Sequence, residues 1–194
     1  MRIRTGIFGG TFDPIHSGHL ILAEYLMDEI KLSEIWFLPA HHHIFKSVKQ
    51  ISSAVHRLNM LELALQNNPN FKLLDMELNH AKISYTVDTL QKLKNEFPTN
   101  DFFFLLGTDN MNQFKEWKNP EKILQLCQLV LLERPNYYIQ EDNKKYFKNS
   151  ISASTPLLKI SSSEIRRRVK DRLSIRYMVP DTVMEYILQN NLYI

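Results

Sequence analysis

The sequence "GGTFDPIHSGHLILAEY", Gly9 to Tyr25, places two of the chain's five glycines next to each other, directly after an apolar run and before an amphipathic helical pattern. The apolar run, Ile3 to Phe8, is typical of a strand that is buried on both faces. A chain that leaves a sheet needs permissive backbone angles, and glycine also lets a ligand approach the backbone closely. We therefore expect a strand, a ligand-binding loop and a helix in this order.

Short β-rich runs alternate with helical patterns along the following residues. Strands are expected at Ile3–Phe8, Ile35–Leu38, Phe71–Leu74, Asp101–Leu106 and Leu129–Leu132. Helices are expected at His19–Asp28, Ala54–Gln66, Thr86–Phe97 and Pro120–Leu126. This alternation favours right-handed crossovers and a doubly wound, mostly parallel sheet. The predicted fold class is α/β, Rossmann-like, with helices on both faces of the sheet and ligands at the carboxyl ends of its strands.

The composition changes after Pro135. The segment "NYYIQEDNKKYFKNS", residues 136–150, is polar, aromatic and charged. We interpret it as a solvated connection over the core, in preference to a surface that stacks single-stranded nucleic acid. Helices are then expected at Ser161–Val169 and Pro180–Leu188, as a helical cap on the same core. Residues 1–194 are therefore predicted to form one domain, whose C-terminal helical part runs from about 160 to 194.

The overall composition indicates a globular protein with one sizeable core. The chain has 194 residues, 44% of them hydrophobic, and a formal net charge of +3. So small a charge gives no reason to expect a nucleic-acid or membrane partner. Cys127 is the only cysteine, so no internal disulfide or cysteine-based zinc site is available, and we expect a buried thiol. No window approaches the roughly 18 apolar residues of a membrane span, and we expect a cytoplasmic protein.

Two histidines, His16 and His19, lie three residues apart at the expected start of the first helix. Asp13-Pro14 favours an extended step or turn before that helix, and Ser17 or a neighbour can cap it. The amides at a helix start attract phosphate, and both rings can reach the same anion as donors. A metal site completed by His41 to His43 and a purely structural turn remain as alternatives.

The loop carries neither of the common nucleotide-binding glycine patterns. GxGxxG and GxxxxGK[ST] are both absent, which excludes an ordinary dehydrogenase and a P-loop NTPase. "HSGH", His16 to His19, instead matches the (H/T)xGH element of the nucleotidylyltransferase superfamily, and "GGTFDPIHSGHL" closely resembles the opening of bacterial nicotinate-mononucleotide adenylyltransferases. Further matches follow in order at Ser84–Leu90, Leu105–Asn110 with Trp117, Glu133–Pro135, Ile160–Val169 and Tyr177–Ile187, so the resemblance covers nearly the full chain.

The resemblance implies an adenylyltransferase that joins ATP to nicotinate mononucleotide, giving deamido-NAD and pyrophosphate in NAD biosynthesis. The substrate's phosphate is itself the nucleophile, so such a protein has to supply in-line positioning and donors for the charge that builds on the phosphoryl oxygens. Magnesium is expected to arrive with ATP, without a dedicated metal site. The resemblance leaves open the oligomeric state, including a homo-oligomer, and the preference for nicotinate over nicotinamide mononucleotide.

The family's functional residues map onto matching positions of this chain. The implied catalytic residues are His16, His19, Lys46 and Arg166. The implied ATP-binding residues are Gly9, Gly10, Thr11, Phe12, His16, His19, Gly107, Asp109, Ser161, Ser162 and Arg166. The implied mononucleotide-binding residues are Lys46, Tyr85, Thr86 and Trp117, although Thr86 by itself is also a good helix N-cap. Arg167 and Arg168 are expected on a solvated helix face.

The chain departs from the family pattern in two loops. "PAHHHIFK", Pro39 to Lys46, keeps the lysine but has Phe45 where the family usually has a histidine, and the role of His41 to His43 stays open. Asn79 and His80 stand where basic residues are common.

Three other functions compete with this interpretation. A sister transferase for phosphopantetheine or cytidylyl transfer and a non-catalytic nucleotide-binding module both remain as alternatives. A class I aminoacyl-tRNA synthetase is disfavoured, because the chain is short and has no lysine-rich loop of the KMSKS type.

Overall fold

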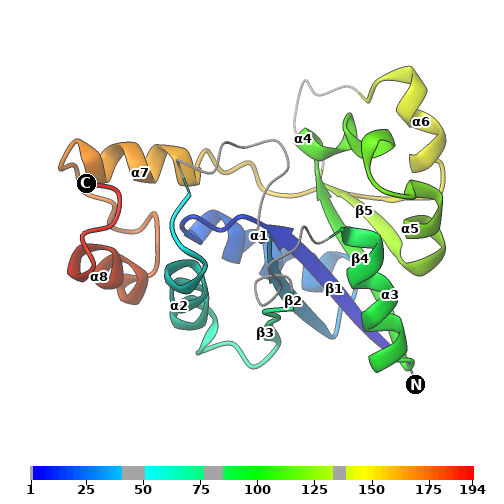
Figure 1. Cartoon of the computed structure of the whole chain (residues 1–194), viewed down its shortest axis with the longest axis horizontal. Coiled ribbons are helices and arrows are strands. Elements are labelled where there is room, and N and C mark those ends of the chain that lie inside the picture. Colours follow the sequence, from blue (N-terminus) through cyan, green and yellow to red (C-terminus); the bar gives the residue numbers. More distant parts are fainter. Residues whose placement is uncertain (1, 41–50, 77–84, 133–138) are drawn as a thin grey trace.

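The computed structural model describes residues 2–40, 51–76, 85–132 and 139–194. Within these residues a six-stranded sheet has the order β3-β2-β1-β4-β5-β6 (Figure 1). The strands are β1 (Ile3–Gly10), β2 (Glu34–Pro39), β3 (Phe71–Leu73), β4 (Asn100–Gly107), β5 (Gln128–Leu132) and β6 (Ile151–Ala153). Every neighbouring pair is parallel, so the doubly wound α/β prediction is confirmed. The strand order reverses between β1 and β4.

The helices lie on both faces of this sheet. They are α1 (Ser17–Glu29), α2 (Ala54–Leu65), α3 (Thr86–Glu96), α4 (Thr108–Met111), the 3-10 helix η2 (Phe114–Glu116), α5 (Pro120–Leu126), α6 (Glu141–Phe147), α7 (Ser162–Lys170) and α8 (Asp181–Gln189). In Figure 1, α7 (orange) and α8 (red) lie beside α2, whereas α5 and α6 lie at the other end of the molecule. Among the described residues, no helix is both long enough and apolar enough to span a membrane.

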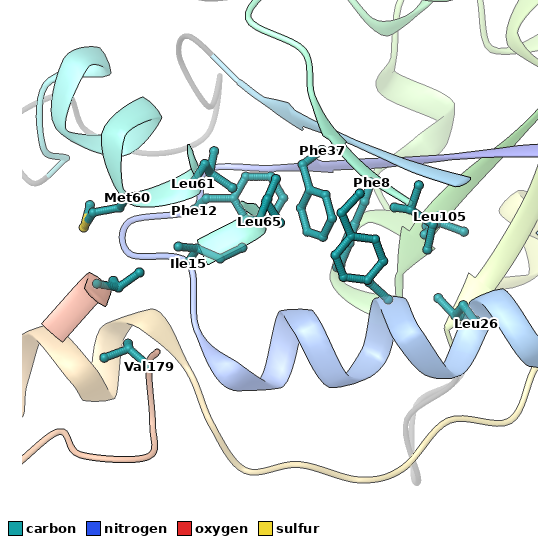
Figure 2. Packing of buried hydrophobic residues seen from close by; sticks show 14 of the residues in the cluster. Phe8, Phe12, Ile15, Leu26, Phe37, Met60, Leu61, Leu65, Leu105 and Val179 are labelled. Atoms are coloured by element: carbon teal, nitrogen blue, oxygen red, sulfur yellow. The ribbon is translucent and has the colours of Figure 1, made fainter. Parts of the chain in front are cut away.

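Two hydrophobic clusters, one on each face, hold the layers together. Successive side chains of a strand point to opposite faces, so Phe8 joins the cluster that includes α1, α2, α7 and α8, while Ile7 joins the cluster that includes α3 and α5. Figure 2 shows Phe8 and Phe37 pointing from the sheet toward α1, and Leu26 pointing back from that helix. This two-sided burial explains why β2, β4 and β5 each contain a continuous run of apolar residues.

The structure corrects the interpretation of residues 136–150. From residue 139 onward this segment is described, and it contains α6, followed by the edge strand β6, which pairs with β5. Phe147 is buried, with its ring centroid 5.4 Å from that of Phe114. Asn143 is also buried, accepting from the Lys115 amide at 3.2 Å and donating to the Asn112 carbonyl at 2.9 Å. The expectation of a solvated connection therefore holds for most side chains from residue 139 to 150, but it fails for Asn143 and Phe147. A buried amide satisfied by backbone groups looks polar in the sequence.

The two C-terminal helices are confirmed, and they pack on the same face as α1. Ile165 of α7 and Ile187 of α8 are fully buried in the cluster that also contains Leu26. The Thr182 hydroxyl donates to the Leu63 carbonyl at 3.2 Å, which joins α8 to α2. Cys127 is buried as expected, and desolvation raises the pKa of its thiol to about 12. That residues 1–194 form a single domain stays a prediction.

Candidate active site

The carboxyl ends of β1 and β4 lie at the point where the strand order reverses. Residue pairing between these strands stops at Ile7 and Phe104, although β1 continues to Gly10 and β4 to Gly107. The last residues of the two strands therefore diverge. A Cβ atom added at Gly107 would meet nothing within 4 Å, so the space beside β4 is open there. Ligands of doubly wound sheets bind at this kind of position.

His16 and His19 begin α1 as a reciprocal cap. His16, not Ser17, is the N-cap, and its Nδ1 accepts from the His19 amide at 3.3 Å. Nδ1 of His19 in turn accepts from the His16 amide at 3.3 Å. The ring centroids are 3.6 Å apart and the ring planes differ by 22°, so the two imidazoles are stacked. The expected shared face is confirmed, and the cap, expected at Ser17 or a neighbour, is the neighbouring His16, whose imidazole nitrogen takes the place of a serine hydroxyl.

Both imidazoles are neutral at neutral pH. Desolvation lowers the pKa of His16 to about 4, and desolvation together with the charge of His16 lowers the pKa of His19 well below its usual value. Because each Nδ1 accepts a backbone hydrogen bond, each neutral ring carries its proton on Nε2. Both Nδ1 atoms face the first turn of α1, so both Nε2–H groups point away from it. The result is a pair of uncharged donors at the end of β1.

Close packing explains two glycines and one strained residue around this pair. A Cβ atom at Gly18 would lie 3.0 Å from Nδ1 of His16, so a larger residue would push against the stacked rings. A Cβ atom at Gly10 would lie 2.8 Å from the ring of Phe12. Phe12 has a left-handed backbone, φ 50°, and its buried ring packs edge-on against His19 at 5.1 Å. The absence of a side chain at Gly10 thus leaves room for the Phe12 ring, which packs against His19.

The start of α7 reaches the same loop from the far end of the sequence. Arg166 donates from Nη1 to the Asp13 carbonyl at 2.6 Å, and the Ser162 hydroxyl donates to the Pro14 carbonyl at 2.9 Å. Ser161 is the N-cap of α7, and its hydroxyl accepts from the Glu164 amide at 3.2 Å. The structure therefore brings Ser161, Ser162 and Arg166 next to the loop that carries His16.

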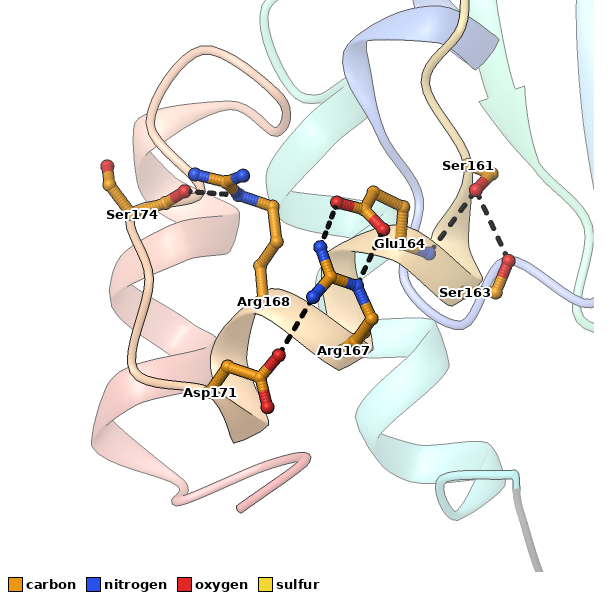
Figure 3. A network of polar contacts seen from close by, with 7 residues as sticks. All are labelled: Ser161, Ser163, Glu164, Arg167, Arg168, Asp171 and Ser174. Atoms are coloured by element: carbon orange, nitrogen blue, oxygen red, sulfur yellow. Dashed lines mark hydrogen bonds and ion pairs between the residues drawn. The ribbon is translucent and has the colours of Figure 1, made fainter.

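The two neighbouring arginines of α7 face solvent, as expected. Arg167 pairs with Glu164 at 2.8 Å and with Asp171 at 2.9 Å, and Arg168 donates to the Ser174 carbonyl at 2.8 Å (Figure 3). Their guanidinium groups are engaged along the outer face of α7. Of the three consecutive arginines, only Arg166 contacts the loop after β1.

Three further side chains, those of Arg57, Asp13 and Tyr193, hold this loop, and sequence reasoning gave none of these side chains a role. Arg57 of α2 is 2% exposed and donates from Nη1 to the Thr11 carbonyl at 2.9 Å and to the Ala40 carbonyl at 2.8 Å. Asp13 is also 2% exposed, and its Oδ1 accepts from the Tyr193 hydroxyl at 2.7 Å. The position of Asp13 inside the opening motif was the one available signal, because Arg57 and Tyr193 lie in unremarkable helical and terminal sequence.

The residues expected to hold the mononucleotide gather on the β4 side of the site. Tyr85 is the N-cap of α3 and makes no side-chain capping bond, so Thr86 is the first helical residue and not the N-cap. The Lys118 ammonium lies 4.6 Å from the centroid of the Tyr85 ring. Its neighbour Trp117 packs edge-on against Phe104 at 6.0 Å. Tyr85 and Trp117 are therefore on adjoining segments, and both are partly buried.

Several predicted positions lie outside the described residues. They are Lys46 with His41 to His43 and Phe45, the pair Asn79 and His80, the segment Glu133 to Pro135, and the side chain of Asp109.

Comparisons with known proteins agree with this geometry. A family model described as cytidylyltransferase-like matches residues 7–168. The nicotinate-nucleotide adenylyltransferase of Bacillus subtilis (strain 168) is 36% identical over 190 residues, covering 98% of this chain and 98% of that protein. A "Probable nicotinate-nucleotide adenylyltransferase" of Thermomicrobium roseum is 42% identical over 197 residues, covering 98% of this chain and 91% of that protein.

A solved structure is similar to this chain over nearly its full length. It is Plasmodium falciparum nicotinic acid mononucleotide adenylyltransferase complexed with NaAD, which matches with a TM-score of 0.80 and 27% identity over 98% of this chain and 97% of that chain. The fold, the opening motif and the similarity over the full length all indicate the same family. The chain therefore belongs to the nicotinate-nucleotide adenylyltransferases, within the cytidylyltransferase-like family.

Proposed function

We propose that this protein transfers the adenylyl group of ATP to nicotinate mononucleotide, forming nicotinate adenine dinucleotide and releasing pyrophosphate. The observation that carries the proposal is the stacked pair of neutral imidazoles at the end of β1, whose rings are 3.6 Å apart, with Arg166 held on the same loop. The relatives named as nicotinate-nucleotide adenylyltransferases and the solved relative complexed with NaAD support this substrate pair.

The reaction needs positioning and charge stabilisation, and no covalent intermediate with the protein. A phosphate oxygen of the mononucleotide attacks the α-phosphorus of ATP, a new P–O bond forms, and the bond from that phosphorus to the bridging oxygen of the β-phosphate breaks. The Nε2–H groups of His16 and His19 would donate to oxygens of the α-phosphate and the departing pyrophosphate. Because both rings are neutral and fixed by backbone bonds, they need little reorientation as charge develops there.

Arg166 and the start of α7 would hold the outer phosphates of ATP. The guanidinium already lies beside the loop after β1, because its Nη1 bonds the Asp13 carbonyl at 2.6 Å. Ser161 and Ser162 begin α7, where backbone amides and the helix dipole favour an anion. We therefore assign the β- and γ-phosphates to this helix start, and backbone contacts along Gly9, Gly10, Thr11 and Phe12 to the nucleotide.

The open ends of β4 and α3 would hold the sugar and the pyridine ring. We assign the ATP ribose to Gly107 and Asp109, because Gly107 ends β4 beside open space. The nicotinate ring would lie against Trp117, with its carboxylate near Tyr85 and Thr86 at the uncapped start of α3. Lys46 would add a phosphate contact.

Magnesium would be bound mainly by ATP. Mg²⁺ favours phosphate oxygens and water over protein cages. The described part of the chain contains no group of three or more His, Cys, Asp or Glu side chains that could hold a metal ion. We therefore assign neither a side chain to the ion nor a step of the reaction to it.

A pyrophosphate-release assay with matched substrate pairs tests the proposal. We expect release with ATP plus nicotinate mononucleotide, and much less when CTP replaces ATP or phosphopantetheine replaces the mononucleotide. A parallel arm with nicotinamide mononucleotide measures how far the carboxylate is preferred. Release with phosphopantetheine alone would favour a sister transferase, and nucleotide binding without any release would favour a non-catalytic module.

A further inference from the structure

Side chains from distant parts of the sequence clamp the loop between β1 and α1. Arg57 of α2 binds the Thr11 carbonyl, Arg166 of α7 binds the Asp13 carbonyl, and Ser162 binds the Pro14 carbonyl. The buried Asp13 carboxylate receives the Tyr193 hydroxyl from the segment after α8. The carbonyls of one short loop are thus held by side chains more than 40 residues away in the sequence.

Asp13 takes part in these contacts through both its side chain and its backbone carbonyl. Its Oδ1 accepts from the Tyr193 hydroxyl at 2.7 Å, and its Oδ2 accepts from the Ser52 amide at 3.2 Å. Its backbone carbonyl is the atom that Arg166 binds at 2.6 Å. A carboxylate buried this deeply is costly unless its oxygens are satisfied, so its orientation is fixed by these donors. Asp13 precedes His16, the N-cap of α1, by three residues, so it lies in the loop that leads into this helix.

Tyr193 combines an unusual backbone conformation with its hydroxyl bond to Asp13. Its φ is 68°, in the left-handed region that bulky residues rarely adopt and keep only where the surroundings enforce it. Its ring packs against the cluster around α1 and α2, and the hydroxyl lies 4.0 Å from the Met60 sulfur. Burial and the charge of Asp13 raise the pKa of this phenol, so it stays protonated and remains a donor.

We infer that Tyr193 is a positioning residue for the transfer reaction. Its hydroxyl orients the buried Asp13 carboxylate, and Asp13 in turn fixes the position of Arg166 relative to the His16–His19 pair. This inference rests on the function proposed above. Tyr193 touches none of the reacting atoms in this scheme. It acts through one hydrogen bond to the loop that carries the donors.

The test compares two variants that each remove one phenolic hydroxyl. Tyr193→Phe keeps the ring and removes the bond to Asp13. The control, Tyr186→Phe, removes a hydroxyl that bonds His56 at 2.9 Å and Asn59 at 2.8 Å, between α8 and α2 and outside the loop. Tyr193→Phe leaves an oxygen of the buried Asp13 carboxylate without this donor, so its urea midpoint should fall more than that of Tyr186→Phe, whose lost bonds involve no carboxylate.

We expect Tyr193→Phe to lower kcat about tenfold while the KM for each substrate changes less than about threefold, because a displacement of the order of 1 Å in catalytic groups mainly affects the transition state. Tyr186→Phe should keep kcat within about twofold of the original chain. Amide hydrogen exchange of residues 11–20 should accelerate in Tyr193→Phe alone. Equal kcat losses in the two variants, or an effect on KM only, would overturn the inference.

A double-mutant cycle with Asp13→Asn checks that the two residues act through one bond. If they do, adding Tyr193→Phe to Asp13→Asn lowers kcat by much less than tenfold further. Full additivity would contradict the inference. If the original chain shows no adenylyl transfer, the proposed function fails, and hydrogen exchange of residues 11–20 then decides by itself whether Tyr193 holds the loop.

Discussion

His16 should make the stability of this protein fall as the medium becomes acidic. In the folded chain its pKa is about 4, against 6.5 for an unperturbed histidine, because burial disfavours the charged ring. The unfolded chain therefore binds a proton at a higher pH than the folded chain. This contribution to the free energy of unfolding is complete above pH 6.5 and is lost as the pH falls from there toward 4.

The size of the effect follows from the difference between the two pKa values. A difference of about 2.5 pKa units corresponds to about 3 kcal/mol, of which about 2 kcal/mol is lost between pH 7 and pH 5. His16 is 6% exposed, so little solvent screening reduces this figure. The variant His16→Asn removes the titrating ring and keeps a good N-cap residue at the start of α1.

Urea unfolding of both proteins between pH 4.5 and pH 8 measures this difference. The other titrating groups are shared, and the pKa of His19 depends in part on the charge of His16, so subtracting one curve from the other gives the effect of His16 together with this coupling. We expect the original chain to lose about 2 kcal/mol more than His16→Asn between pH 7 and pH 5. Parallel curves would mean that His16 is charged or exposed in the folded protein, and the mechanism with neutral donors would then be wrong.

Three further predictions concern residues at or beneath the site. His19→Ala should lower kcat about a hundredfold, as the loss of other oxyanion-type donors does, with an unchanged far-UV circular dichroism spectrum. The control variant His56→Ala should keep kcat within about threefold of the original chain. Similar losses of kcat in both variants would argue against a specific role of His19. Gly18→Ala should displace the His16 ring from its stacked position on the His19 ring and lower kcat about tenfold in the same assay. An unchanged kcat would show that the stacking is unimportant for the reaction. Arg57→Met should reduce the free energy of unfolding by about 3 kcal/mol in urea titrations, because two buried loop carbonyls lose their charged donor; a change below about 1 kcal/mol would show that water replaces it.

The sheet could be predicted from the sequence because its central strands are buried on both faces. Continuous apolar runs of strand length, such as the one within Asp101–Leu106, are typical of a buried parallel sheet, and the helices between them are long enough to show a period. The edge strand β6 and helix α6 were missed because the sequence of α6, EDNKKYF, is mostly charged and polar and β6, ISA, has only three residues and follows directly on such sequence. Elements of the same lengths, β3 and α5, could be predicted because their own sequences show an apolar pattern. The N-cap of α3 was predicted wrongly because the usual capping residue, Thr86, stands next to the actual cap, Tyr85. The cap of α1, expected at Ser17 or a neighbour, is the neighbouring His16.

The sequence predicted only those parts of the candidate site that lie within local motifs. His16 and His19 were paired correctly by their spacing, and Arg166 by its place in a recognisable segment. The bond between Asp13 and Tyr193 joins residues 180 positions apart, and no local pattern indicates such a contact. Long-range polar contacts of this kind depend on tertiary packing, which a single sequence does not reveal by its periodicity.

The clamping of one loop from α2, α7 and the segment after α8 has a consequence for how activity appears during folding. An early intermediate containing only the β1–α1–β2 unit would have the opening motif but none of the side chains that hold its carbonyls. Nucleotide binding should therefore develop late, together with docking of residues 162–194. Recovered catalysis would then report that the whole chain, and not merely its first half, has reached the native state.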